Sequence, residues 1–161
     1  MRLAVSQVKL LKVLDRHPDL LDEIKVAYAY NPSIGGRMAT TTHIPVELYL
    51  HSSEWEPDAE YVDGQIEERP MGEWNHADWQ AAILEFFRAR RRDWNIRAAA
   101  ELRVQVSAGN FRIPDVTVLG RNIPVEQVIT HPPIAVFEIL SPKDTVTRMM
   151  TKLGDYEQMG I

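Results

Sequence analysis

Two short apolar runs that each carry a single carboxylate constrain this chain more than any other feature. They are Arg112-Ile-Pro-Asp-Val-Thr-Val-Leu119 and Ala135-Val-Phe-Glu-Ile-Leu-Ser-Pro142. Apolar and β-branched residues in runs of this length are typical of buried strands. A carboxylate among buried residues is costly unless it is paired or binds a metal. Asp115 and Glu138, in neighbouring strands, therefore point to a shared divalent cation.

Composition narrows the class of protein. The 161 residues, 45% of them hydrophobic, suffice for one domain with an ordinary core. The net charge of −5 does not favour nucleic-acid binding, although a local basic patch matters more than the total. Without cysteine there is neither a disulfide nor a thiolate zinc site. No run approaches the roughly 20 apolar residues of a membrane span and no signal peptide is evident, so we expect a soluble cytoplasmic protein with no membrane association.

The two ends of the chain differ from its middle. Met38-Ala-Thr-Thr-Thr resembles a start of translation, so residues 1–37 are interpreted as an N-terminal extension of uncertain status, either an appended arm or an over-extended reading frame. The domain is expected over residues 38–161. It ends at Gly160-Ile161, where a helix stop normally introduces another strand, so we expect it to be short at its C-terminus.

The first half of the domain combines a hairpin with a helix. Pro45 is expected to open a short helix over 44–51. Asp63-Gly64 is typical of a two-residue turn, which predicts a hairpin over Glu60–Glu68. A longer helix is predicted from His76 to about Asp93, with Asn75 as its N-cap. The arginines near its end are either a solvated helix terminus or a patch that contacts phosphates; the candidates for DNA contact are Arg88, Arg91 and Arg92.

The second half reads as three strands and a helix. Strands are predicted over 96–107, with Leu102, Val104 and Val106 on one face, over 111–119 and over 134–140, with a loop over 121–133. Asp144 is expected to cap a last helix ending near Met159. The order of elements predicts an α/β or α+β fold, with helices flanking a mixed central sheet.

The order and spacing of several motifs resemble a known family. Pro114-Asp115 followed by Phe137-Glu-Ile-Leu-Ser-Pro142 is similar to the PD-(D/E)XK nuclease superfamily, and more narrowly to the Uma-two family of putative restriction endonucleases. The resemblance runs from Ile44 to Ile161 and includes the hairpin, His76, Lys152, Tyr156 and Gly160. It implies a restriction-endonuclease-like fold and a metal-dependent endonuclease acting on DNA.

The resemblance also implies roles for individual residues. Asp115, Glu138 and the backbone carbonyl of Ile139 would bind Mg²⁺ or Mn²⁺, because hard oxygen ligands suit these ions. Lys152 would supply the catalytic positive charge, since Leu140 stands where the superfamily has its lysine. Glu101 is a candidate ligand of a second ion, and His76 is a further candidate site residue. The family usually continues past Gly160 into another strand, so the sheet is expected to lack its last strand and to present an unpaired edge.

Three functions remain open. One is a Mg²⁺-dependent DNA endonuclease, the second is a catalytically inactive nucleic-acid-binding or interaction module of the same fold, and the third is a metal-dependent hydrolase of a smaller phosphoester. Cleavage specificity and oligomeric state, a homodimer included, are not determined by the sequence.

Overall fold

The computed structural model describes residues 43–52, 55, 59–69, 72–141 and 144–161. The proposed extension, residues 1–37, lies outside these described residues. The chain divides into two compact units, one that ends at Glu68 and one that spans Arg69–Ile161. We describe the two units separately.

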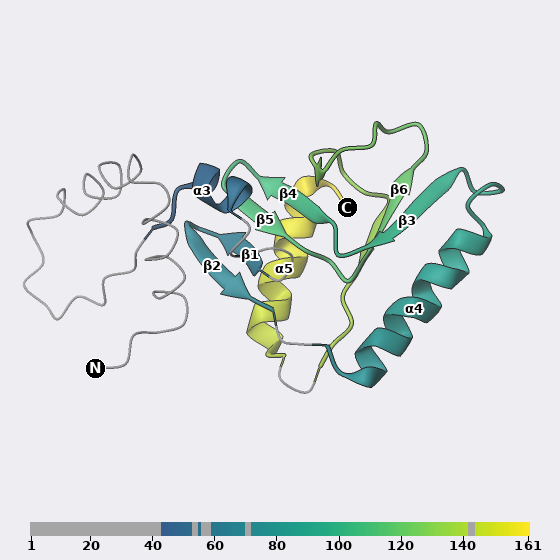
Figure 1. Ribbon diagram of the computed structural model, residues 1–161, viewed down its shortest axis with the longest axis horizontal. Helices are drawn as coiled ribbons and strands as arrows, with labels where there is room; N and C mark the ends of the chain where they lie inside the picture. The colour runs from purple at the N-terminus through teal and green to yellow at the C-terminus, as the bar shows by residue number, and fades with distance from the viewer. Residues whose placement is uncertain (1–42, 53–54, 56–58, 70–71, 142–143) are drawn as a thin grey trace, which may run out of the picture. The chain divides into compact units, whose positions relative to one another are not determined.

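The first unit contains a short helix and a hairpin. The helix α3 spans Val46–His51, with Pro45 in the N-cap position. Strands β1 (Ala59–Val62) and β2 (Gln65–Glu68) pair antiparallel, which confirms the predicted hairpin (Figure 1). Both turn residues have positive φ, 48° at Asp63 and 79° at Gly64, as the twist of a two-residue hairpin requires. A Cβ at Gly64 would also lie 2.0 Å from the His43 ring, so a side chain there would require that ring to move.

The second unit begins with helix α4, Trp74–Ala89. It ends four residues before the predicted terminus, because the chain turns at Arg90, whose N–H donates to the Phe87 carbonyl. The sequence predicted Asn75 as the N-cap, and this prediction was wrong. Glu73 holds the N-cap position, and Asn75 lies in the first turn of the helix. The helix packs along β3 and β6, at the right of Figure 1.

Each of the first two long strands predicted in the second unit is divided in two. The first becomes β3 (Ile96–Ala100) and β4 (Arg103–Ser107), because Glu101 takes a positive φ of 53° that ends the extended chain. The second becomes β5 (Asn110–Arg112) and β6 (Val116–Gly120), interrupted by Ile113-Pro114-Asp115. Proline has no N–H to donate to a strand ladder, which explains the second break.

These strands belong to two sheets. In one, β3, β6 and β8 (Ala135–Phe137) pair antiparallel in the order β3-β6-β8. In the other, β4 pairs antiparallel with β5 and parallel with β7 (Val128–Ile129). The prediction of a loop over 121–133 was therefore wrong at β7. A strand of two residues is too short to show the alternation of apolar and polar residues that predicts a strand. Strand β8 is also shorter than predicted, so Glu138 follows it.

Helix α5, Val146–Met159, closes the unit against β4 (Figure 1). Its N-cap is Thr145, whose hydroxyl accepts from the Arg148 N–H at 3.3 Å, and not Asp144 as predicted. The buried Arg112 of β5 holds α5 through Asp155, with Nε to Oδ2 at 2.7 Å. The core between α5 and the sheets consists of Val104, Val106, Leu119, Ile129 and Tyr156. Val104 and Val106 confirm the predicted buried face of their strand.

The described residues thus contain three helices and two sheets, which confirms the predicted α+β class. None of the helices in the described ranges is long and apolar enough to cross a membrane.

Candidate active site

Strand pairing brings the two acids predicted from the sequence to the same place. In the antiparallel pair β6–β8, Val116 lies opposite Phe137. Asp115 immediately precedes Val116, and Glu138 immediately follows Phe137, so the two acids lie at the same end of this strand pair. Both acids line one cavity of about 260 Å³.

Asp115 is buried, with 2% of its surface exposed, and its carboxylate is surrounded by donors. Oδ1 accepts from a guanidinium nitrogen of Arg69 and lies 3.1 Å from His76 Nε2. Oδ2 accepts from the backbone N–H of Ile139 at 2.6 Å. The Gln80 amide donates to the backbone carbonyl of Asp115 at 3.0 Å. The N-terminal half of α4 therefore fixes both the side chain and the backbone of this aspartate.

Glu138 is paired with residues of α5. Lys152 Nζ lies 3.0 Å from Oε2, and the Tyr156 hydroxyl donates to Oε1. Lysine and tyrosine are four residues apart, so they project from one face of the helix. Lys152 is buried, with 6% of its surface exposed, which is rare for lysine unless it is paired. The structure thus brings Lys152 into the acid cluster.

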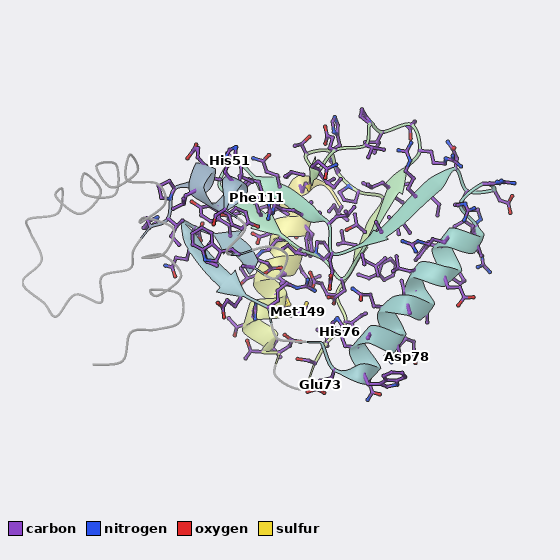
Figure 2. All side chains as sticks on the ribbon, viewed as in Figure 1. His51, Glu73, His76, Asp78, Phe111 and Met149 are labelled. Carbon is purple, nitrogen blue, oxygen red and sulfur yellow. The ribbon has the colours of Figure 1, made fainter. Side chains whose placement is uncertain are left out.

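The first turns of both helices contribute to the cavity wall. Figure 2 shows Glu73 and His76 at the N-terminal end of α4 and Met149 on the first part of α5. The remaining wall comes from β8 and the segment that follows it. Besides Asp115 and Glu138, the lining residues that carry charge are Arg69, Glu73, Asp144, Arg148 and Lys152.

Asp144 has an altered acidity. Burial alone raises the pKa of this carboxyl, but hydrogen bonds from Ser141 and the positive charges of Arg148 and Lys152 outweigh burial and hold the pKa below its ordinary value. One of these bonds is from the Ser141 N–H to Asp144 Oδ2, at 2.6 Å. Asp144 is therefore ionised across the neutral range and adds negative charge beside the two central acids.

Two groups of predicted site residues lie apart from this cavity. Arg88, Arg91 and Arg92 lie at or beyond the last turn of α4, while His76 is in its first turn. At ~1.5 Å per residue, Arg88 is roughly 18 Å from His76 along the helix. Glu101 is near the cavity but is not among the described lining residues; its Oε1 is 3.7 Å from Arg69 Nη1.

The sequence interpretation did not identify Arg69 or Gln80. Gln80 follows His76 by four residues, so the helical period could have placed both on one face. Arg69 follows β2 directly and precedes Pro70, and no spacing rule links it to Asp115, 46 residues later. Only the tertiary fold brings that arginine to the acid.

The described residues do not contain a cluster of three or more histidine, cysteine, aspartate or glutamate side chains arranged to hold a metal. A divalent cation would therefore depend on Asp115, Glu138 and backbone oxygen at Ile139. These are hard oxygen donors of the kind that Mg²⁺ and Mn²⁺ prefer. All four carboxylate oxygens already accept hydrogen bonds, from Arg69, His76, Ile139, Lys152 and Tyr156.

Comparison with known proteins identifies the family. Residues 46–161 match the family model Uma2, described as putative restriction endonuclease. A crystal structure of a putative nuclease belonging to DUF820 from Anabaena variabilis superimposes with a TM-score of 0.61 and 24% identity, over 71% of this chain and 68% of that one. This likeness establishes a shared fold. No similar sequence was found among curated proteins. Because the family model covers well over half of the chain, the protein belongs to the Uma2 family of putative restriction endonucleases.

Proposed function

We propose that the protein is a Mg²⁺- or Mn²⁺-dependent endonuclease that hydrolyses phosphodiester bonds of DNA. One observation carries the proposal: two carboxylates at the ends of paired strands share a cavity with a buried lysine. The family description supports a nuclease. DNA is the proposed substrate because restriction endonucleases, the class named in the family description, cleave DNA.

The residues at the cavity fit a divalent cation in part. A carboxylate oxygen has two lone pairs, so the Oδ2 of Asp115, which accepts from the Ile139 N–H, retains acceptor capacity for a cation. Asp115, Glu138 and the Ile139 carbonyl would hold the ion. When bound, it supplies a Lewis acid for a phosphoryl oxygen and lowers the pKa of a coordinated water.

The chain's own side chains have separate tasks. Lys152 brings a fixed positive charge to the place where negative charge grows on the scissile phosphate, and its buried position keeps that charge poorly screened. Glu138 holds the Lys152 ammonium, and the Tyr156 hydroxyl holds Glu138. His76 orients Asp115. Arg88, at the end of α4, and Arg91 and Arg92, just beyond it, would contact more distant phosphates of the DNA, and Glu101 would bind a second ion.

A nicking assay with a matched variant tests the proposal. Supercoiled plasmid is incubated with the protein in Mg²⁺, and in EDTA, and Glu138→Gln is compared with Glu157→Gln. Glu157 is exposed on the same helix as Lys152 and provides the same change of charge outside the cavity. We expect nicking in Mg²⁺ by the parent and Glu157→Gln, with none in EDTA and none by Glu138→Gln. Equal nicking by both variants contradicts the proposal.

A second function has a specific observation in its favour. Asp115 and Glu138 are already neutralised by Arg69 and Lys152, as expected for acids that serve the fold. A catalytically inactive nucleic-acid-binding module of the same fold accounts for that pairing. Binding of duplex DNA that is unaffected by Mg²⁺ and never followed by cleavage distinguishes this module from the endonuclease.

A further inference from the structure

Arg69 has no role in the function proposed above, yet it makes the most direct contact with the central aspartate. Its Nη2 pairs with Asp115 Oδ1, and its Nη1 is 3.7 Å from Glu101 Oε1. The arginine side chain is 13% exposed and lines the cavity. It is thus a nearly buried cation between an acid of the site and an acid at its edge.

The hydrogen bonds of Asp115 create a conflict with metal binding. Oδ1 accepts from both Arg69 and His76, which uses its two lone pairs, while Oδ2 accepts from Ile139. A cation that binds Oδ1 must replace one of these donors, and a cation that binds the remaining lone pair of Oδ2 still brings two positive charges to a carboxylate that Arg69 already neutralises. Arg69 is the donor that a dication repels at every pH, because guanidinium does not lose its proton.

We propose that Arg69 and the divalent cation bind Asp115 alternately, and that the arginine released by the metal binds the phosphate of the substrate. The second half of this inference rests on the proposed nuclease function, whereas the first does not. In the metal-free protein the arginine is the counterion that a buried aspartate requires.

The charges explain the order of events. Asp115 and Glu138 contribute two negative charges, and Arg69 and Lys152 contribute two positive ones, so these four groups are balanced without metal. The other charged residues of the cavity, Glu73, Asp144 and Arg148, add one net negative charge, so a bound dication leaves the cavity with an excess of one positive charge, which attracts a phosphodiester. Glu101, with a side chain that is 45% exposed, lies on the solvent side of Arg69 and offers it a partner during the exchange. The guanidinium fork fits phosphate as well as it fits carboxylate.

Metal binding measured without DNA tests the competition. Free Mn²⁺ is followed by electron paramagnetic resonance during titration of the protein, of Arg69→Gln and of Arg121→Gln. Arg121 is exposed and outside the cavity, so its variant is the control for charge. We expect Arg69→Gln to bind Mn²⁺ about tenfold more tightly, since it removes one charge-assisted competitor, and Arg121→Gln to match the parent. Unchanged or weaker binding by Arg69→Gln overturns the inference.

The parent protein provides a test that does not depend on whether a variant folds. In protein labelled with ¹⁵N-arginine, the Arg69 side-chain Nε–H resonance, identified by its loss in Arg69→Lys, should shift as Mg²⁺ is added. A resonance that stays in place at saturating Mg²⁺ refutes the exchange.

DNA binding and cleavage test the second half. Arg69→Gln should cut duplex DNA about 10²-fold more slowly in saturating Mn²⁺, although it binds the metal more tightly. The salt dependence of DNA affinity, measured with metal, should lose about one phosphate contact. Cleavage at the parental rate overturns the phosphate role. If the parent does not cleave DNA while the Mn²⁺ titrations behave as expected, the proposed function fails and the competition stands.

Discussion

Lys152 carries its charge into a nearly closed part of the protein. Its helix packs on β4 and is held by the Arg112–Asp155 pair. This position lets the Lys152 ammonium reach Glu138, 3.0 Å away. In the proposed reaction this ammonium stabilises negative charge on the phosphate, an effect that is strongest where water is excluded.

Replacement of Lys152 should separate turnover from metal binding. We expect Lys152→Ala to reduce single-turnover cleavage about 10²-fold or more, with Mn²⁺ affinity little changed, because the charge acts on the transition state. Lys152→Arg should restore little activity, since the planar fork differs in shape from an ammonium and keeps its proton near neutral pH. Full activity of the alanine variant would reduce Lys152 to a structural partner of Glu138.

Asp144 gives the fold a pH dependence that can be measured. The folded pKa is held below the unfolded value of about 3.9, so the charge contributes stability that is present above about pH 4 and is lost as pH falls through the folded pKa. Asp144→Asn keeps the shape without the charge. In urea unfolding, we expect the variant to be less stable than the parent at pH 7, and this difference to shrink as pH falls below about 4. A difference that is constant over this range would contradict the assigned cause.

At the scale of elements, the breaks between strands decide where the acids lie. The break at Pro114 places Asp115 just before β6, and the early end of β8 places Glu138 just after Phe137. Both carboxylates therefore lie at the ends of the paired segment, where a side chain can reach a cavity. Had both runs continued as unbroken strands, the acids would lie within the ladder.

Glu101 adopts a backbone conformation that glycine tolerates better. Its φ of 53° costs a residue with a side chain roughly 1 kcal/mol. We expect Glu101→Gly to raise the free energy of unfolding by about that amount, less the entropy that glycine gains in the unfolded chain. Glu101→Gln, which keeps the backbone cost and removes the charge, is the matched control and should not be stabilised. Denaturant unfolding that finds the glycine variant no more stable than the glutamine variant would contradict this prediction.

The residue pattern was informative where a local rule applied. Asp63-Gly64 identified the hairpin, and the lone acid in each apolar run pointed to Asp115 and Glu138, which line one cavity in the structure. The break between β3 and β4 was not predicted, because it occurs at Glu101 and glutamate rarely adopts a positive φ. Two-residue β7 was too short to predict. Arg69 was missed because its link to Asp115 depends on long-range packing.

For the molecule as a whole, the net charge of −5 opposes an approach to DNA. In the proposed complex a bound dication and the cations Arg69, Arg148 and Lys152, which line the cavity, offset this charge locally. DNA affinity should therefore depend on metal and decrease with salt. The central claim is that Asp115 and Glu138 bind one divalent ion together.

Anomalous diffraction from crystals soaked in Mn²⁺ tests that claim most directly. We predict one strong anomalous peak in the cavity, ~2.0–2.6 Å from a carboxylate oxygen of Asp115 and from one of Glu138. The same soak of Glu138→Gln should give a much weaker peak, because one charged ligand is gone. A fully soaked parent crystal with no peak beside these acids, or with the ion on one of them alone, would contradict the account.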